Sequence, residues 1–492
     1  MKRLLIISLT TVMCLNITSC NDFLDEELPG DLAPETLLID QGGVESVLYS
    51  AYLKYRFQYG FHNSVMENYE YPGDILFQTG GGMNIAFQLM SNFNWSSTQS
   101  TANGAIWNTR YSSIRDVNIV IDNIDVLTDE AVKATLLAEA RFIRAVNYYY
   151  LYDAFGPVPI RTSSSDDPNL TRPTDTDFLS FLEQEFVESA ADLPNPGEEI
   201  EYGRATNGAA LGYLTRLYML NKQWQNAADA AQQVMNLSYY ELFPSYKDLF
   251  KVENEPDKNG ANREMMLVAT NTTIHPFGNK ISAPALPPGF VSTPEIPEFT
   301  ASGIANWAAQ FRFYDSFVDS FEPDDTRKSL IFSSYMNGAG DMVDLTATPN
   351  NRRTLKFFDN GAVVASHGND FPMLRYADIL LMRAEALNEL NGPTAEAVDL
   401  VNQVRTRAGL TNLDAASFTQ ESLRDHILDE RGWEFYYEGL RRTDLIRHGK
   451  FIEKAQARGV TNAADFHVLF PIPQAEIDAN INMTQEDQNP GY

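Results

Sequence analysis

The chain has 492 residues, of which 44% are hydrophobic and 21% charged, so it is long enough to fold around a large core. Its 66 acidic and 37 basic residues give a formal net charge of −29. A chain this acidic repels nucleic-acid backbones and anionic membranes, and it disfavours a polyanionic glycan unless a local basic patch is present. Aromatic residues make up 12%, which suits a helical core or a surface on which sugar rings stack.

The N-terminus has the features of a lipoprotein signal. Lys2 and Arg3 precede an apolar run over residues 4–15, which is too short to span a bilayer. Small residues then lead directly to Cys20, in the order Ile17-Thr18-Ser19-Cys20. We expect residues 1–19 to be cleaved and Cys20 to be diacylated as the new N-terminus. The alternative is a soluble secretory signal with Cys20 as a bystander.

The cysteine count agrees with lipidation. The chain has two cysteines, and Cys14 lies within the signal. The mature chain therefore has one cysteine and forms no internal disulfide, and acylation of Cys20 accounts for it. Lipid chains would anchor the protein without a transmembrane helix.

Helical patterns dominate the first half of the mature chain. After an acidic, turn-rich tether over residues 21–34, apolar residues recur at helical spacing over 103–126 and 130–155. The second helix is predicted to stop at Gly156-Pro157. A helix pair over 206–236, with Thr206 as a possible cap, resembles a tetratricopeptide unit because small alanines alternate with large side chains.

The second half predicts irregular structure followed by more helices. Six prolines between residues 271 and 303 exclude a helix there, and the strand candidates are residues 264–270 and 353–358. Helices are then predicted over 376–390, 394–408 and 421–437. The predicted fold class is mainly α, with tetratricopeptide-like helix pairs as a scaffold and a large loop-rich region that carries short strands.

Several ordered motifs resemble the SusD/RagB family of outer-membrane nutrient-binding lipoproteins. Each motif is weak alone, but their joint occurrence in this order is specific. One departure is Gly432, where the family more often has a large residue, which could loosen a local ion pair. The motifs are Cys20-Asn21-Asp22-Phe23-Leu24-Asp25, Glu139-Ala140-Arg141-Phe142, Phe155-Gly156-Pro157-Val158-Pro159, Arg375-Tyr376-Ala377-Asp378, Val404-Arg405-Thr406-Arg407, Glu430-Arg431-Gly432-Trp433-Glu434 and Phe470-Pro471-Ile472-Pro473.

The resemblance implies a single domain over 20–492. Its helix-pair scaffold would lie mainly in 103–236 and 372–450, and its irregular ligand-binding region mainly in 60–100 and 237–371. It also implies an oligosaccharide ligand, a TonB-dependent SusC-type transporter as partner, a location at the outer membrane facing the cell exterior, and no catalytic activity or cofactor.

Charged motifs have both a catalytic and a structural interpretation. Glu430, Glu434 and Glu438 share one helix face, and paired carboxylates are the machinery of glycoside hydrolases. We favour a structural ion-pair network with the nearby Arg424, Arg431, Arg441 and Arg442, because unpaired like charges destabilise a helix. His426 and Glu430 have a metal-ligand spacing, but no second histidine completes a set, so we predict no metal site.

Aromatic residues on irregular segments are the candidate sugar contacts, because aromatic residues on periodic helices belong to the core. Trp107, Trp224 and Trp433 fall in the second group. The candidate glycan-binding residues are Trp307, Asn306, Phe311, Trp95, Tyr69, Tyr71 and Asp74.

The sequence thus predicts a lipid-anchored glycan-binding protein that delivers its ligand to a transporter and is not an enzyme. Three alternatives remain open: a peptide-binding member of the same transport system, a surface glycoside hydrolase, and a helical-repeat scaffold that binds only proteins.

Overall fold

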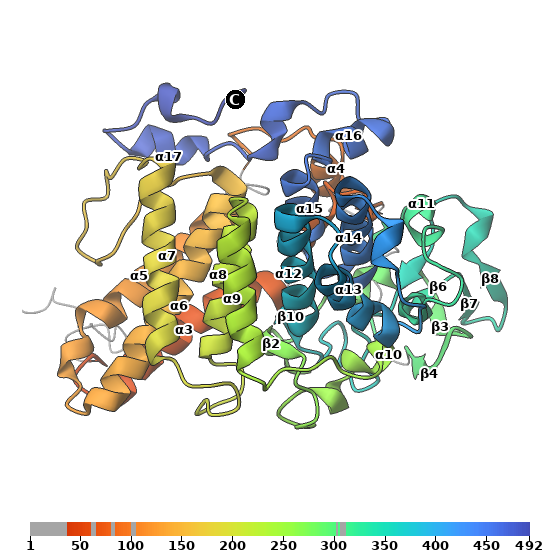
Figure 1. The fold of residues 1–492 in the computed structure, drawn as a ribbon, viewed down its shortest axis with the longest axis horizontal. Coiled ribbons are helices and arrows are strands. Elements are labelled where there is room, and N and C mark those ends of the chain that lie inside the picture. Colours follow the sequence, from red (N-terminus) through yellow and green to blue (C-terminus); the bar gives the residue numbers. More distant parts are fainter. Residues whose placement is uncertain (1–36, 61–64, 80–83, 100–104, 302–303, 306–310) are drawn as a thin grey trace, which may run out of the picture.

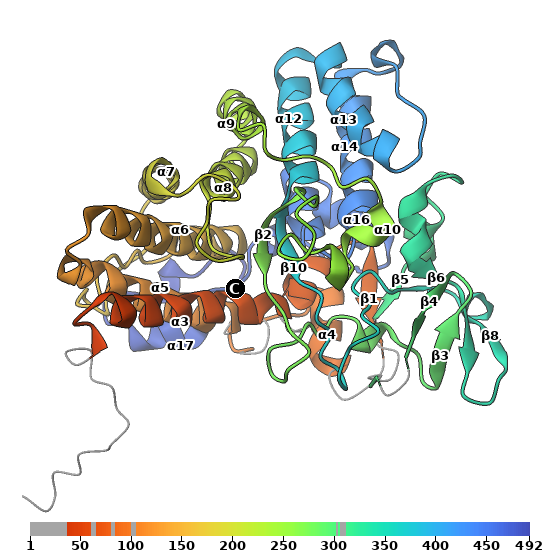
Figure 2. The same cartoon turned by 90° about the horizontal axis from the view of Figure 1, so that it is seen from below.

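Helices packed side by side form the larger part of the molecule (Figures 1 and 2). The computed structural model describes residues 37–60, 65–79, 84–99, 105–301, 304–305 and 311–492. Along the chain, α3 packs on α5, α5 on α6, α6 on α7, α7 on α8, α8 on α9, α9 on α12, and α12 on both α13 and α14. The helices are α3 (Gln41–Gly60), α5 (Ala105–Asp122), α6 (Glu130–Phe155), α7 (Asp175–Asp192), α8 (Asn207–Leu220), α9 (Trp224–Asn236), α12 (Tyr376–Asn391), α13 (Ala395–Arg407) and α14 (Gln420–Phe435).

Local signals set the ends of these helices. The Asp129 carboxylate accepts hydrogen bonds from the backbone N–H groups of Ala131 and Val132 and starts α6. Gly156 ends α6 with a φ of 71°, a conformation that glycine adopts at little cost. The predicted cap is confirmed at Thr206, whose side chain accepts from the N–H of Ala209 and starts α8. These start and stop signals are local in the sequence, and the helices predicted over 130–155 and 206–236 are confirmed.

One helix is shorter than predicted. The first predicted helix runs to residue 126, but α5 ends at Asp122. Residues Ile124–Val126 form a separate 3-10 turn, because Asn123 leaves the helical conformation with φ −114° and ψ 8°. The apolar spacing continues through this turn, and the spacing alone therefore misplaced the helix end.

Short strands occupy the region between α9 and α12. The strand predicted over 264–270 is confirmed as β2 (Met265–Ala269), antiparallel to β10 (Phe371–Arg375). The prediction over 353–358 is wrong beyond Thr354, since Lys356 turns inward to donate to the main-chain oxygen of Tyr436. The other strands are β1 (Leu76–Gln78), β3 (Phe290–Thr293), β4 (Ile296–Thr300), β5 (Phe311–Phe313), β6 (Ile331–Phe332), β7 (Ser334–Asn337), β8 (Met342–Asp344) and β9 (Arg353–Thr354).

The strands form four small sheets. The largest has the order β4-β3-β7-β8, while β1 pairs with β5, β2 with β10 and β6 with β9. The proline-rich stretch contributes β3, β4 and one 3-10 turn (Ala283–Ala285), and its described residues contain no α-helix, as predicted. Short helices complete the structure: α4 (Asn84–Ser91), α10 (Tyr246–Leu249), α11 (Asp315–Val318), α15 (Arg441–Arg447), α16 (Phe451–Ala457) and α17 (Gln474–Ala479).

Buried ion pairs join α14 to the strand-rich region. The predicted structural role of the three glutamates is confirmed, but their predicted partners are wrong. Glu430 pairs with Arg327 and Arg405, Glu434 with Arg375, Arg407 and Arg327, and Glu438 with Arg375 and Lys356. The neighbouring arginines bind other acids: Arg424 binds Glu389, Arg431 binds Asp378 and Asp444, Arg441 binds Asp74, and Arg442 lies near Asp153.

Candidate functional site

The predicted sugar contacts do not form one exposed platform. Tyr69, Tyr71, Trp95 and Phe311 are between 0% and 4% exposed, so their rings do not face solvent in this structure. Trp307, Asn306 and Cys20 lie outside the described residues.

Neighbouring aromatic side chains explain this burial. The Trp95 ring packs on Phe93, and its Nε1 donates to the hydroxyl of Tyr492 at 2.7 Å, so the C-terminal tail covers it. The Tyr71 ring contacts Phe311 edge-on, with ring centroids 5.4 Å apart. These residues were chosen because they lie on irregular segments, but here the irregular segments pack on one another and have a core of their own.

Asp74 has a structural partner. Its two carboxylate oxygens accept hydrogen bonds from Nε and Nη2 of Arg441 at 2.6 and 3.0 Å. Burial opposes ionisation, but the Arg441 guanidinium outweighs it and holds the pKa of Asp74 below its usual range. Both oxygens already have a charged donor, so this side chain is poorly placed to accept from a sugar hydroxyl.

Two segments of the predicted binding region nevertheless meet. Strands β1 and β5 are antiparallel, with Phe77 directly opposite Arg312. In each strand the middle residue is half-buried and its two neighbours are buried, so Phe77 and Arg312 point to the outer side of this ribbon. Tyr314 follows β5 and stacks on Phe77, with ring centroids 4.8 Å apart and planes at 28°. We call Phe77, Arg312 and Tyr314 the aromatic–arginine face.

Arg458 fixes the position of Tyr314. Its Nη1 donates to the Tyr314 hydroxyl at 2.9 Å, and its Nη2 donates to the main-chain oxygen of Pro72 at 2.8 Å. Its guanidinium also lies 5.3 Å from the centroid of the Tyr314 ring, within cation–π range. The stacked pair is therefore held in place before any ligand arrives, which lowers the entropic cost of binding.

Arg312 has an unused donor. Its Nε makes no hydrogen bond within the described part of the chain, and burial lowers the pKa of its guanidinium. Arg353 lies close by: burial and the charge of Arg312 together lower the pKa of Arg353 to about 9. An arginine beside an aromatic pair can donate to hydroxyl oxygens while the rings pack on the C–H face of a sugar.

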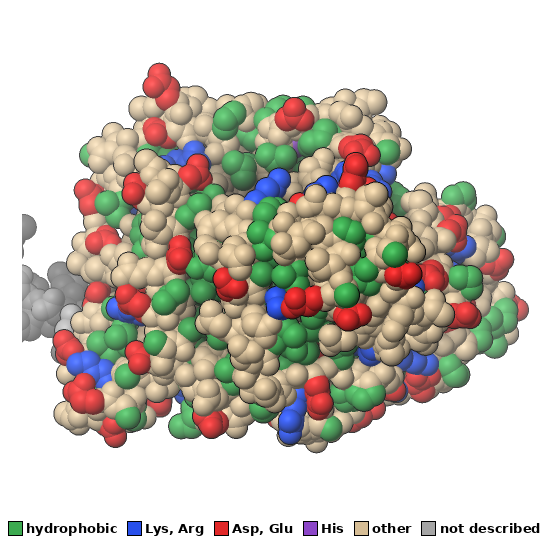
Figure 3. Space-filling model, in the orientation of Figure 1, with side chains coloured by type: hydrophobic (Ala, Val, Ile, Leu, Met, Phe, Trp, Pro, Cys, Tyr) green, Lys and Arg blue, Asp and Glu red, His purple; other side chains and the backbone are tan. Residues whose placement is uncertain are grey.

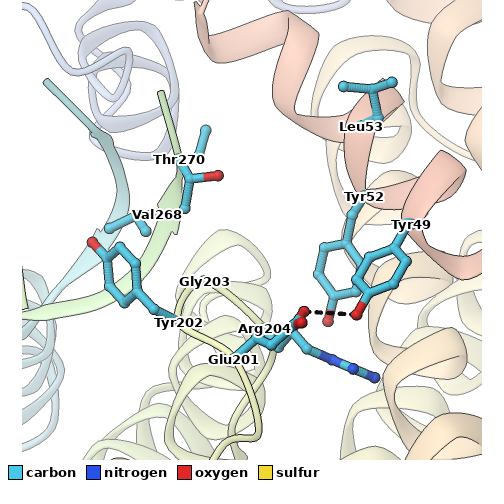
Figure 4. Close-up of a pocket in the computed structure, with 10 residues that line it drawn as sticks. Tyr49, Tyr52, Leu53, Glu201, Tyr202, Gly203, Arg204, Val268 and Thr270 are labelled. Atoms are coloured by element: carbon cyan, nitrogen blue, oxygen red, sulfur yellow. Dashed lines mark hydrogen bonds between the residues drawn. The ribbon is translucent and has the colours of Figure 1, made fainter. Parts of the chain in front are cut away.

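A second hollow lies between α3, the loop before α8 and strand β2 (Figure 4). It has a volume of about 250 Å³. Its polar groups bond mainly to one another or to Glu139: the Tyr49 hydroxyl donates to Glu201 at 2.6 Å, while Tyr52 and Arg204 both bind Glu139 at 2.7–2.8 Å. With these donors already engaged, this hollow is the weaker candidate.

The described residues contain no candidate metal site and no candidate membrane-spanning helix. No group of three or more acidic, histidine or cysteine side chains gathers there in a way that could hold a metal ion. His426 lies 3.6 Å from Glu430, and burial lowers its pKa to about 4, so the ring is neutral at physiological pH. Within the same residues, no helix combines the length and apolar character needed to cross a bilayer.

Two family models match the chain. One, described as the SusD family, matches residues 312–492. The other, described as starch-binding and associating with the outer membrane, matches residues 22–219. The first range includes helices α11 to α17, and the second includes helices α3 to α7.

Curated relatives span nearly the whole chain. SusD-like protein P25 of Formosa agariphila is 27% identical, over 96% of this chain and 97% of its own length. The starch-binding protein SusD of Bacteroides thetaiotaomicron is 26% identical, over 77% of this chain and 76% of its own length.

Solved structures show the same fold. A laminarin-binding SusD-like protein superposes with a TM-score of 0.78 at 24% identity, over 92% of this chain and all of that chain. Surface glycan-binding protein A from Bacteroides thetaiotaomicron, in complex with laminarihexaose, gives a TM-score of 0.72 at 21% identity, over 92% of this chain and 99% of that chain. The molecule is thus a helical protein with tetratricopeptide-like pairs and a strand-bearing irregular part. It belongs to the SusD/RagB family.

Proposed function

We propose that the protein is a lipid-anchored outer-membrane protein that binds oligosaccharide on its aromatic–arginine face and delivers it to a TonB-dependent SusC-type transporter. Three findings support this: the family assignment, the description of one family model as starch-binding and associated with the outer membrane, and relatives named for starch or laminarin binding. The lipoprotein signal ending at Cys20 supports the anchor.

The aromatic–arginine face is the observation that carries the proposal. It offers a stacked ring pair and the half-buried Arg312 on one side of the β1–β5 ribbon. A hexose has an apolar C–H face and a rim of hydroxyls, and this combination of groups complements both. We retain Trp307 and Asn306 as proposed additional contacts, since they precede β5 by only a few residues in the sequence.

The proposed role is binding without catalysis. Glycoside hydrolysis requires two carboxyl groups on either side of the scissile bond. Asp74, on the loop before β1, is held by Arg441, and Glu430 and Glu434 on α14 and Glu438 in the turn after it are buried among arginines and Lys356. These acids support the fold and are not presented to a ligand.

Affinity gels containing starch or laminarin test the proposal with the chain from residue 21 onward. Replacing Phe77 and Tyr314 together by alanine should abolish the retardation that the wild type shows. Phe277→Ala is the matched control, because Phe277 is a surface aromatic residue, 37% exposed, away from β1 and β5. If the wild type, the double variant and the Phe277→Ala control are retarded equally, the binding site is not the aromatic–arginine face. If no glycan retards the wild type, the proposal is wrong.

Two further measurements separate the alternatives. Appearance of shorter products when oligosaccharides are incubated with the purified protein would establish a hydrolase instead. Binding of peptides, with no glycan bound, would establish the peptide-binding alternative. Copurification of the lipidated protein with its transporter tests the delivery step, and Cys20→Ala should abolish labelling by a fatty-acid analogue and release the protein from the membrane.

A further inference from the structure

A separate groove lies between α5, the loop over residues 157–170 and α17. It has a volume of about 540 Å³, within the range of small-ligand sites, and it shares no residue with the aromatic–arginine face. Figure 1 shows α17 crossing the end of the helical scaffold, and the lining residues place it against α5.

Two aromatic rings line the groove. Trp107 and Tyr111, one turn apart on α5, have ring centroids 5.0 Å apart. Trp107 is backed by Phe155, with centroids 5.4 Å apart, and the Tyr111 hydroxyl donates to the main-chain oxygen of Pro159 at 2.7 Å. Both rings are therefore fixed. Trp107 is only 4% exposed, so the half-buried Tyr111 provides the aromatic surface of the groove and Trp107 supports it.

Hydrogen bonds tie the two walls together. The Asn480 side-chain amide, at the end of α17, donates to the main-chain oxygen of Leu170 at 2.9 Å. The Asn169 side chain accepts from the N–H of Ile481 at 3.2 Å, and the Asn169 main-chain oxygen accepts from Asn482 at 3.0 Å. The groove is thus a preformed feature of the fold.

The remaining polar groups have free bonding capacity. The Nη2 of Arg161 donates to the main-chain oxygen of Pro168 at 2.9 Å, and its Nε is buried without a partner in the described ranges, so Nη1 is the donor left for a ligand. Glu476 on α17 also lines the groove, and neither it nor Arg161 forms an ion pair there. Asn108 adds an exposed amide. A ligand with a net charge would be attracted by one of the two charged residues and repelled by the other, whereas neutral hydroxyls can donate to Glu476 and accept from Arg161.

We infer that this groove is a second carbohydrate site, which binds a neutral mono- or disaccharide unit with its ring against Tyr111. The choice of carbohydrate, and not the groove itself, rests on the proposed function. A site on a different set of elements from the aromatic–arginine face would let one protein hold a polysaccharide at two points, which raises the effective concentration of the chain at the first site.

Methyl NMR tests this inference locally. Met483 lines the groove, and among 14 methionines its ε-methyl signal can be assigned by Met483→Leu. In protein labelled at methionine methyl groups, laminaribiose or maltose at millimolar concentration should shift the Met483 signal in a saturable way. Ala479→Trp fills the groove from the exposed side of α17 without removing any side-chain bond, and it should weaken this response at least tenfold. Ala339→Trp, at the exposed turn between β7 and β8, is the matched control and should leave the response unchanged.

The outcomes distinguish the two proposals. If the Phe77→Ala/Tyr314→Ala variant loses binding at the face while the Met483 signal still responds, both proposals stand. If affinity gels show glycan binding at the aromatic–arginine face but no disaccharide shifts the Met483 signal, the groove inference alone is overturned. A response to charged peptides but to no disaccharide overturns the carbohydrate assignment of the groove.

Discussion

Arg375 and Glu434 form an ion pair of 2.9 Å that connects the end of β10 to the last turn of α14, although 59 positions separate them in the chain. Arg375 also binds Glu264 and Glu438, and its side chain is 1% exposed. One arginine therefore binds three carboxylates from two segments, one directly before β2 and the other at the end of α14 and in the turn after it. This arrangement makes the strand-rich part of the molecule depend on the helical scaffold.

Arg375→Met should destabilise the protein by about 3–5 kcal/mol, because it removes the one cation that three buried carboxylates share. Urea unfolding followed by tryptophan fluorescence measures this loss. Arg352→Met is the matched control, since Arg352 is partly exposed and its partner Asp319 is 61% exposed, and we expect a loss of less than about 1 kcal/mol. Equal losses in the two variants would show that the buried network contributes no more than a surface pair.

Acid should unfold the protein through its paired carboxylates. Burial opposes ionisation of Asp378, but ion pairs with Arg216 and Arg431 outweigh it and lower its pKa to about 2. The pKa values of Glu434 and Glu385 are also lowered, as their arginine partners outweigh burial. Groups of this kind stabilise the fold fully above their unfolded pKa of about 4, and that contribution is lost as the pH falls through the folded value.

We therefore expect the free energy of unfolding to fall steeply between pH 4 and pH 2, with Asp378 alone accounting for about 2 kcal/mol. Urea unfolding at pH 6, 4 and 3 measures the slope. Asp399→Asn is the control, because this acid is exposed on α13 and forms no ion pair or side-chain hydrogen bond within the described residues, so its removal should leave the slope unchanged. A flat profile down to pH 3 would contradict the assignment of these ion pairs.

The helices were predictable because their periodicity and caps are local. Glu130–Phe155 carries its apolar stripe, its Asp129 cap and its Gly156 terminator within a single segment. The ion-pair partners were not predictable in this way. Spacing predicts Glu430, Glu434 and Glu438 on one helix face, but α14 ends at Phe435, so Glu438 lies in the turn after it. Spacing also does not show which segment packs there, and the partners are residues 327, 356, 375, 405 and 407.

The candidate face was missed for a related reason. Strands β1 and β5 have three residues each, too few for alternation to stand out. The signal that could have found it is the pattern Leu76-Phe77-Gln78 beside Phe311-Arg312-Phe313, in which the middle residue alone faces outward. The loop aromatic residues Tyr71 and Phe311 were chosen instead. Phe311 lies on the buried side of the same ribbon, and Tyr71 packs against it.

Glu70 should give the opposite pH dependence from Asp378. Burial is the main cause that raises its pKa to about 8, and one of its oxygens has no hydrogen-bond partner in the described part of the molecule. Between pH 4.5 and 8 the folded state therefore holds a proton that the unfolded state has lost, so stability falls as the pH rises through this window.

Glu70→Gln removes this titration and keeps an oxygen to accept from the N–H of Gly439. The free energy of unfolding of the variant, relative to the wild type, should rise by a few kcal/mol between pH 5 and pH 9. For Glu396→Gln, at an exposed position, the free energy of unfolding should change with pH as it does in the wild type over the same range. If the free energy of unfolding of the Glu70→Gln variant also follows that of the wild type with pH, the Glu70 carboxyl is not protonated in the folded protein.

Salt and substitution together test how the aromatic–arginine face recognises its ligand. For a neutral oligosaccharide such as laminarihexaose, Arg312 acts as a hydrogen-bond donor, so the affinity should change less than about twofold between 50 and 500 mM NaCl. Arg312→Gln should weaken binding about 10-fold, since a hydrogen bond from a charged donor contributes about 1.5–3 kcal/mol and an amide replaces part of it. Isothermal titration calorimetry measures both effects. Arg352→Gln is the control, because Arg352 is a partly exposed arginine that pairs with Asp319. A steep loss of affinity with salt would instead identify an anionic glycan, drawn by the adjacent charges of Arg312 and Arg353 despite the overall charge of −29.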